Sequence, residues 1–366
     1  MRIALATDAW TPQINGVVTT LKATATQLGA LGHEVRFLTP QGLACVPCPS
    51  YPEIRLAIAP GNFVARQLRA FAPHAIHVAT EGPLGMAVRR CCRARGVPFT
   101  TSYHTRYPEY LRARWPIPLA VSYAWLRRFH NAAARTFVAS PTLQRELGSH
   151  GFAQLHLWRR GVDLERFRPM PPDPGLADLP RPLMVSVGRL AVEKNLEAFL
   201  GLEVPGTKLV VGDGPQRAEL ERRYPAARFV GFRTGEGLAR LVGSADVLVF
   251  SSLTDTFGLA MIEALACGVP VAAFPVPGPN DVIEPGVTGV LDPDLATAIA
   301  GALRLDRARC AVRARVFSWE AATAQFLAGL EPIPVPLRSR LAVSRSSAMI
   351  GRIAPRRQPS QAGEPN

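Results

Sequence analysis

The chain lacks several features that mark other classes of protein. Its six cysteines do not follow the paired spacing of a secreted disulfide scaffold. The lone Cys45-Val46-Pro47-Cys48 has no second ligand pair and is best interpreted as two ordinary thiols. No run of about 18 uncharged apolar residues occurs, which argues against a membrane-spanning helix. The apolar start at residues 1–7 is too short for a signal peptide, so we expect a cytoplasmic protein.

Lysine is scarce, and charge is distributed unevenly along the chain. The sequence has 3 lysines beside 39 arginines. Residues 1–172 carry 21 Lys and Arg against 8 Asp and Glu, whereas residues 173–331 carry 15 against 19 and residues 332–366 carry 6 against 1. The first half is therefore strongly cationic, and we expect it to face an anionic surface or partner.

Short apolar runs alternate with amphipathic helical patterns, and this alternation occurs twice. A proline-rich linker at 168–175 separates the two series. Buried strands that alternate with helices predict an α/β protein with two doubly wound domains and a ligand cleft at the carboxyl ends of their strands. Strands are predicted near 2–7, 34–39, 54–58, 75–79, 98–102 and 136–139, and then near 182–188, 207–211, 227–230, 246–250, 269–272 and 288–291.

These patterns set the expected domain boundaries. We place the first domain at 1–172, the second at 173–331 and a tail at 332–366. The tail is basic and rich in Ser and Pro, a composition typical of disordered segments. The last periodic segment, about 318–330, predicts a helix capped by Ser318. We assign it to the second domain, with the alternative that it packs back on the first.

The segment from Thr254 to Glu263 carries the strongest functional signal. Asp255 precedes a predicted helix, Gly258 stands at the junction and Glu263 lies inside the helix. A loop that follows a strand and opens a helix points free N–H groups and a positive dipole end at a bound anion. A carboxylate two turns further along can accept hydrogen bonds from sugar hydroxyls. The combination indicates a nucleotide-sugar site.

Further candidate site residues stand at predicted strand ends and helix starts. Arg189 and Lys194 follow the first strand of the second domain and can hold a diphosphate, although two surface cations on a loop give the same pattern. Gly16 opens the first helix, where a ligand can approach the backbone or a plain turn can form. His104 ends a predicted strand and can contact a sugar or the acceptor; the alternative is a buried histidine with satisfied hydrogen bonds.

Two other segments bear on competing functions. Residues 211–215, Val-Gly-Asp-Gly-Pro, resemble half of a dinucleotide fingerprint, but the third glycine is missing, which disfavours an NAD(P)-dependent oxidoreductase. Residues 103–129 interleave arginines with aromatic rings. Such a segment suits a membrane interface, a nucleic acid or a half-buried helix pair with solvated arginines. Two α/β domains with a sugar-nucleotide site argue against a nucleic-acid partner.

Taken in order, these motifs resemble the retaining glycosyltransferases of family 4, which have the GT-B fold of two Rossmann-like domains facing each other across a cleft. The resemblance covers about residues 1–330, and within the family it is greatest to members that transfer mannose or sulfoquinovose to lipid acceptors. Three further stretches carry it, namely Arg160-Gly161-Val162-Asp163, Phe167-Arg168-Pro169 and Phe229-Val230-Gly231-Phe232.

The resemblance implies a role for each site residue. The implied catalytic residues are His104 near the reacting carbon, Arg189 and Lys194 on the diphosphate, and Asp255, where many members carry glutamate, on the sugar hydroxyls. Glu263 would accept hydrogen bonds from the ribose of the donor. The remaining implied donor-binding residues are Gly16, Phe257 and Gly258 at the phosphates and Gly231 and Phe232 at the base.

The resemblance also implies an activity. It is the retaining transfer of a hexose, of mannose or glucose type, from a GDP- or UDP-sugar to a lipid or lipid-linked acceptor, with no metal or other cofactor. We expect a peripheral protein on the cytoplasmic face, with the cationic first domain on an anionic membrane surface. The alternatives are transfer to a soluble glycan or small molecule and, more distantly, an NAD(P)-dependent oxidoreductase.

Overall fold

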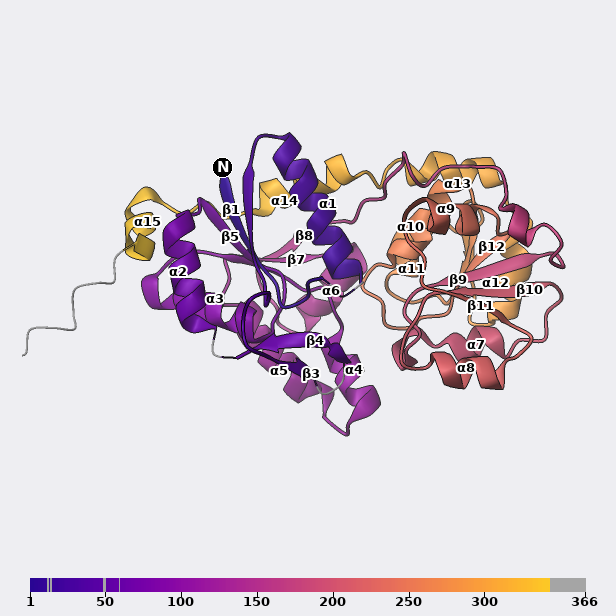
Figure 1. The fold of residues 1–366 in the computed structure, drawn as a ribbon, viewed down its shortest axis with the longest axis horizontal. Coiled ribbons are helices and arrows are strands. Elements are labelled where there is room, and N and C mark those ends of the chain that lie inside the picture. The colour runs from indigo at the N-terminus through magenta and orange to yellow at the C-terminus, as the bar shows by residue number, and fades with distance from the viewer. Residues whose placement is uncertain (12, 14, 49–50, 59, 343–366) are drawn as a thin grey trace, which may run out of the picture.

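The two series of strands form two parallel sheets, each in its own lobe of the molecule (Figure 1). The structure, a computed structural model, describes residues 1–342 except 12, 14, 49–50 and 59. In the first domain the strand order is β2-β1-β5-β6-β7-β8. The bounds are β1 Arg2–Ala6, β2 Glu34–Leu38, β5 Ala75–Val78, β6 Thr100–Ser102, β7 Arg135–Val138 and β8 Leu155–Leu157.

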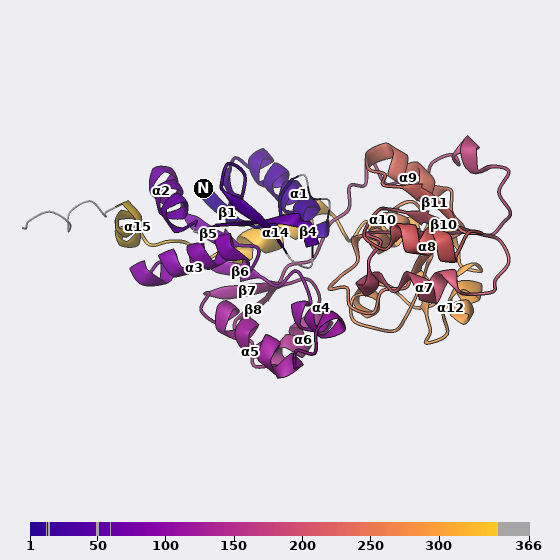
Figure 2. The ribbon, with the colours of Figure 1, turned by 60° about the horizontal axis from the view of Figure 1, so that its bottom comes forward.

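Helices cover both faces of this sheet (Figure 2). Along β1, Ile3 and Leu5 pack with α1 and α14, whereas Ala4 and Ala6 pack with α2 and α3. This alternation is that of a strand buried on both sides. The helices are α1 Gly16–Ala30, α2 Gly61–Phe71, α3 Pro83–Arg95, α4 Tyr107–Arg114, α5 Leu119–His130, α6 Pro141–Ser149 and, from the far end of the chain, α14 Trp319–Gly329 and α15 Val335–Ala342.

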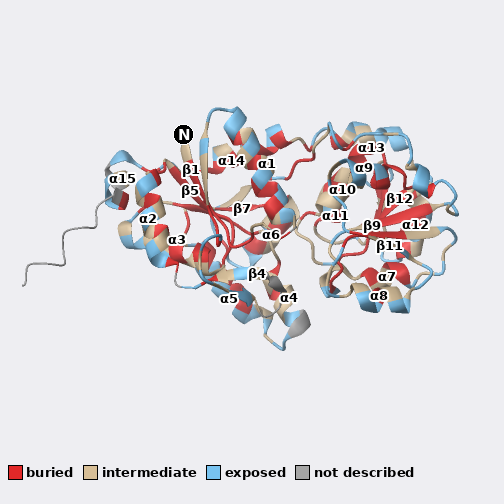
Figure 3. Ribbon diagram, viewed as in Figure 1, coloured by how far each residue is buried: buried red, intermediate tan, exposed pale blue. Residues whose placement is uncertain are grey.

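The second domain repeats this architecture with the strand order β11-β10-β9-β12-β13-β14. Its core lies on both faces of the sheet (Figure 3). The strands are β9 Leu183–Val187, β10 Thr207–Val211, β11 Arg228–Gly231, β12 Val247–Phe250, β13 Val271–Ala273 and β14 Gly289–Leu291. The helices are η1 Pro174–Leu176, η2 Val192–Lys194, α7 Leu196–Leu200, α8 Arg217–Arg223, α9 Gly235–Gly243, α10 Leu259–Ala266, α11 Pro279–Val282, α12 Leu295–Ala302 and α13 Arg307–Ala314.

One predicted strand lies outside the main sheet. The apolar run at 54–58 belongs to β4 Tyr51–Ala57, which pairs antiparallel with β3 Cys45–Cys48 in a separate two-stranded ribbon. A hairpin needs only a short connection, whereas a place in the parallel sheet would require a crossover of a dozen residues or more. Cys45 and Cys48 both lie in this ribbon and form no disulfide within the described residues.

The C-terminal segments return to the first domain. α14 packs against α1, and its Phe326 is buried against Ile3 and Leu5 of β1. The expectation of a disordered tail from 332 onwards is wrong for 332–342, because α15 packs on α2 and α3. Ile333 and Leu341 are buried in the apolar cluster with α2 and α3. Burial of these two side chains stabilises the segment, although the composition of the tail as a whole is basic and polar. Residues 343–366 lie outside the described part of the chain.

Candidate active site

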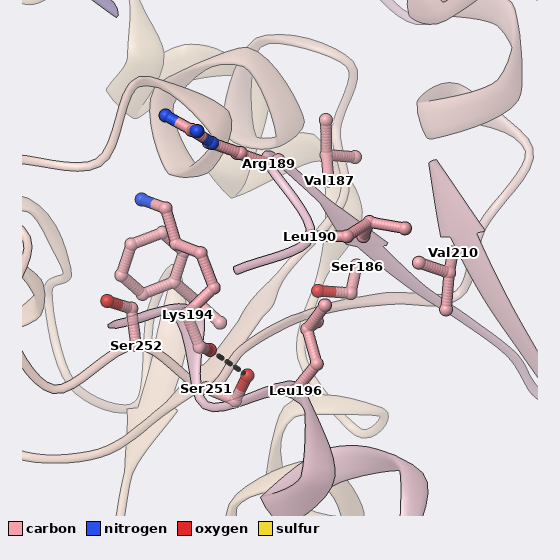
Figure 4. A pocket seen from close by; sticks show the side chains of 11 residues that line it. Ser186, Val187, Arg189, Leu190, Lys194, Leu196, Val210, Ser251 and Ser252 are labelled. Atoms are coloured by element: carbon pink, nitrogen blue, oxygen red, sulfur yellow. Dashed lines mark hydrogen bonds between the residues drawn. The ribbon is translucent and has the colours of Figure 1, made fainter. Parts of the chain in front are cut away.

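A pocket opens where the strand order of the second sheet reverses, between β9 and β12. Ligands bind at this switch point in open parallel sheets, beyond the carboxyl ends of the strands. Arg189 and Lys194 both line the pocket, and their charged ends point to the same side (Figure 4). The remaining lining residues are Ser186, Val187, Gly188, Leu190, Leu196, Val210, Phe250, Ser251 and Ser252.

Hydrogen bonds hold η2 against the end of β12. The hydroxyl of Ser251 donates to the carbonyl of Lys194 at 2.9 Å, and the hydroxyl of Ser252 donates to the carbonyl of Glu193 at 3.1 Å. The side-chain amide of Asn195 donates back to the carbonyl of Ser251 at 3.2 Å. The segment that carries Lys194 is therefore fixed to the loop that leads to Asp255.

Lys194 and Asp255 form an ion pair that the sequence did not indicate. The ammonium nitrogen lies 2.6 and 2.8 Å from the two carboxylate oxygens. Both side chains are partly shielded, with exposed fractions of 25% for Lys194 and 15% for Asp255. The first acidic residue of the 254–263 segment and the pocket lysine therefore form one unit of opposite charges at the mouth of the pocket.

The start of α10 presents backbone donors. Gly258 precedes the helix with a φ of +88°, and a Cβ there would lie 2.6 Å from Met261 Cε and 2.8 Å from Phe250 Cζ. Only glycine fits that conformation and space. Within the described residues, the N–H groups of Phe257 and Gly258 donate to no protein acceptor. They are available to an anion at the positive end of the helix.

The first domain meets this segment directly. The hydroxyl of Thr256 donates to the carbonyl of His104 at 3.0 Å. A Cβ on Gly16 would lie 3.5 Å from Leu259 Cδ1, so the start of α1 stands against the start of α10. Gly16 and His104, predicted from separate motifs, therefore lie beside the acidic segment of the other domain.

His104 is held by a buried arginine. A guanidinium nitrogen of Arg160 lies 3.1 Å from His104 Nδ1, and His104 Nε2 is buried with no hydrogen-bond partner among the described residues. Burial, followed by the charge of Arg160 and the rings of His77 and His130, holds the pKa of His104 well below its ordinary value. The imidazole is neutral at physiological pH.

Glu263 and the base-side residues stand apart from the pocket around Arg189. Glu263 lies in α10, where burial raises its pKa to about 7 against a weaker opposing effect of Arg166. Gly231 ends β11 with a φ of +72°, and exposed Phe232 follows it. In the described part of the chain, none of these three lines the pocket of Figure 4.

Besides the Lys194–Asp255 pair, sequence reasoning missed three further contacts around the site. Arg160 was visible only as part of a motif, with no role assigned. Thr256 lay inside the acidic segment but was not expected to bond to the other domain. The carboxylate of Asp281 accepts a hydrogen bond from the N–H of Thr142 at 3.0 Å, so it adds an acceptor from the other domain to the start of α6, beside the N-cap Ser140. The sequence offered one signal for this contact, because Asp281 stands in the first helical turn after the Gly278-Pro279 pair.

The chain contains an Asp-x-Asp stretch whose two carboxylates form hydrogen bonds at the start of a helix. In Asp292-Pro293-Asp294, the carboxylate of Asp294 accepts hydrogen bonds from the N–H groups of Ala296 and Thr297 and caps α12. Asp292 in turn accepts from the N–H of Asp294 at 2.8 Å. Both side chains are thus engaged in forming the turn that starts the helix.

Comparison with known proteins decides the family. The family described as Glycosyltransferase Family 4 matches residues 14–166, and the family described as Glycosyl transferases group 1 matches residues 181–305. A GDP-mannose-dependent alpha-mannosyltransferase of Mycobacterium tuberculosis is 33% identical over 317 residues, which cover 80% of this chain and 84% of that one. The chain belongs to glycosyltransferase family 4. It is a hexosyltransferase that uses a nucleotide sugar.

Other relatives and solved structures agree with this assignment. The sulfoquinovosyl transferase SQD2 of Arabidopsis thaliana is 32% identical over 269 residues, covering 68% of this chain and 52% of that one. Sucrose-phosphate synthase from Thermosynechococcus elongatus superposes with a TM-score of 0.71 at 23% identity, covering 89% and 97% of the two chains. Anabaena HepE in complex with UDP and glucose gives a TM-score of 0.66 at 16% identity, covering 90% and 98%. The predicted GT-B fold is confirmed.

The length and the hydropathy of the described helices bear on whether any of them could span a membrane. None of those within residues 1–342 is both long enough and apolar enough to cross a bilayer.

Proposed function

We propose that this glycosyltransferase moves mannose from GDP-mannose to a lipid or lipid-linked acceptor, with retention at the anomeric carbon, at an anionic membrane surface. The observation that carries the proposal is the convergence of Arg189, Lys194 and the start of α10 opposite His104. Cations and N–H donors suit a diphosphate, and the facing domain supplies the other wall of the site. The names of the mannosyltransferase and glycolipid-forming relatives support the choice of donor and acceptor.

In the proposed reaction the chain works mainly by electrostatics. The acceptor hydroxyl oxygen bonds to the anomeric carbon, the bond to the diphosphate oxygen breaks, and the leaving diphosphate takes the acceptor proton on the same face. Arg189 and Lys194 would stabilise the negative charge that grows on the diphosphate. Asp255, already paired with Lys194, would hold that ammonium in place while accepting a hydrogen bond from the hexose.

The rest of the donor would lie along the second domain. Glu263 would accept hydrogen bonds from the ribose, and Gly231 and Phe232 would border the base at the end of β11. Gly16 would leave room for the phosphates beside the start of α1, where an added Cβ would be in van der Waals contact with Leu259 at 3.5 Å. The reaction is proposed without a metal or other cofactor, as the family resemblance implies.

The membrane part of the proposal rests on the exposed face of α4 and α5. Trp115, Val121 and Trp125 are large apolar side chains that face solvent there, with Trp125 50% exposed. Arg127 and Arg128 are exposed in the last turns of the same helix. Apolar rings beside guanidinium groups suit the headgroup region of an anionic bilayer. We call this surface, residues 115–128, the Trp125 face.

Sedimentation with vesicles tests the Trp125 face. The double variant Val121→Ser with Trp125→Ser should lose most pelleting with phosphatidylglycerol vesicles while still hydrolysing donor. The control, Val312→Ser with Val316→Ser, changes two exposed apolar residues of the second domain and should pellet as wild type. Equal pelleting of both variants would show that the face does not dock.

The reaction itself is tested by product analysis. Radiolabelled GDP-mannose incubated with the enzyme and a membrane lipid extract should give a chloroform-soluble labelled product whose new linkage is α, as in the donor. The variants Arg189→Ala and Lys194→Ala should lower its rate at least a hundredfold, whereas Arg222→Ala, on the exposed side of α8, should not. Label transferred only from UDP-glucose, label in soluble glycans alone, or a β linkage would each contradict the proposal.

A further inference from the structure

Arg160 is a buried cation without a counter-ion. It follows β8, and only 4% of its surface is exposed. No carboxylate among the described residues lies within ion-pair distance of it. Its guanidinium donates to the carbonyl of Trp158 at 2.6 Å and lies 4.5 Å from the centre of that indole ring. Burying a charge in this way is costly, so the position calls for a function.

We propose that Arg160 is a positioning residue that holds the His104 ring as the neutral tautomer with its proton on Nε2. The inference rests on the proposed function and on the place near the reacting carbon that the family resemblance implies for His104. A guanidinium has N–H donors and no acceptor. Because Arg160 lies 3.1 Å from Nδ1, that nitrogen must accept, and the single ring proton of a neutral imidazole must sit on Nε2.

The geometry of His104 gives this tautomer a use. Nε2 is buried and without a partner among the described residues, so its proton is a donor awaiting an acceptor. The hydroxyl of Thr256 fixes the backbone of His104 to the acidic segment, and the ring lies 5.8 Å from Trp158. A hydroxyl oxygen of the transferred sugar is the acceptor that this position suits.

Neutrality matters as much as the tautomer. Glycosyl transition states carry positive charge on the sugar ring, so a cationic imidazole beside it would be unfavourable. The charged and titratable groups that act on His104 are Arg160, His77 and His130, and the Lys194–Asp255 pair stands beside Thr256 in the facing loop. Burial lowers the pKa of Arg160 to about 9, which leaves it charged at neutral pH. Its charge then opposes a second charge on His104.

Nitrogen NMR of the full-length protein tests the tautomer without reference to activity. Histidine labelled with ¹⁵N at both ring nitrogens gives separate signals for protonated and bare nitrogen, and a His104→Asn spectrum identifies the signals of His104. We expect a proton on Nε2 and a bare Nδ1 from pH 8 to pH 6. A proton on Nδ1, or a cationic ring at pH 7, would overturn the proposal even if mannose transfer is confirmed.

Three substitutions separate the charge of Arg160 from its hydrogen bond. Arg160→Gln keeps a donor for Nδ1 but removes the charge, Arg160→Lys keeps the charge, and Arg160→Met removes both. In Arg160→Gln the proton should stay on Nε2, but loss of the charge should raise the pKa of His104 while burial still lowers it. The fall of kcat at low pH should therefore begin at a higher pH than in wild type. In Arg160→Met both ring nitrogens should show partial protonation at pH 8, and kcat should fall there with KM for the donor within about twofold.

The outcomes distinguish the proposal from a structural role and from failure of the proposed function. Wild-type kcat should not fall on account of His104 between pH 8 and pH 6, and Arg160→Lys should resemble wild type in this respect. If Arg160→Gln and Arg160→Met both keep the wild-type NMR signals and pH profile, Arg160 does not position His104. If the NMR behaves as expected and no sugar is transferred from any donor, the tautomer inference stands and the proposed function fails.

Discussion

The raised pKa of Glu263 makes a quantitative prediction about stability. Burial raises this pKa from an ordinary 4.5 to about 7. As pH rises through this window, the unfolded chain loses the proton at 4.5 while the folded chain keeps it until about 7. The free energy of unfolding should therefore be about 3 kcal/mol smaller at pH 8 than below pH 4.5. Glu263→Gln has no proton to lose, so the variant should escape this loss.

Thermal melting at two pH values checks the magnitude. Relative to wild type, Glu263→Gln should gain about 2 to 3 kcal/mol of stability between pH 5 and pH 8, which is roughly 4 to 12 °C in melting temperature for a domain of this size. The control Glu219→Gln changes an exposed residue of α8 and should track wild type at both values. A melting-temperature difference for Glu263→Gln that is the same at pH 5 and pH 8 would refute the burial argument. Donor turnover by the variant should fall, because an amide is a weaker acceptor for ribose hydroxyls than a carboxylate.

Three further changes test other parts of the structure. Gly258→Ala should cost about 2 to 4 kcal/mol and abolish donor turnover, because its Cβ would meet Met261 in a left-handed conformation; Gly237→Ala, which meets nothing within 4 Å, is the control in a denaturant titration. Asp281→Ala removes the acceptor of the Thr142 N–H and leaves the N-cap Ser140 in place, so it should speed hydrogen exchange of that N–H about fivefold, for a loss of about 1 kcal/mol; unchanged exchange would exclude this hydrogen bond. Leu341→Ala should destabilise the first domain by about 2 to 4 kcal/mol in calorimetry, whereas the exposed Val335→Ala should not.

The sequence predicted the architecture because each strand of the two sheets is a short apolar run between helical patterns. Ile3 to Ala6 on β1 and Val247 to Phe250 on β12 are buried on both faces, so they lack polar alternation. The 54–58 run, Ile-Arg-Leu-Ala-Ile, is also mostly apolar, yet it pairs as a hairpin with the strand just before it in the sequence. Apolar composition does not state which strand a run pairs with.

The candidate site could be predicted only in part. Residues at strand ends and helix starts, such as Gly16, Arg189 and Gly258, are readable because topology brings strand ends together. The Lys194–Asp255 pair joins residues 61 apart, and its geometry depends on η2 and the loop after β12. The same is true of Arg160, whose contact with His104 links the ends of β6 and β8. Pairings of this kind depend on loop conformation, which the periodicity of apolar residues in the sequence does not predict.

Isothermal titration of GDP-mannose into the full-length enzyme tests the central claim most directly. We expect saturable heat at one site per chain in wild type. We also expect Arg189→Ala and Lys194→Ala each to raise the dissociation constant at least tenfold, and Arg222→Ala to leave it unchanged. Equal affinity in all four proteins, or no heat with any nucleotide sugar from a folded wild-type protein, would contradict the claim that this pocket grips the donor diphosphate.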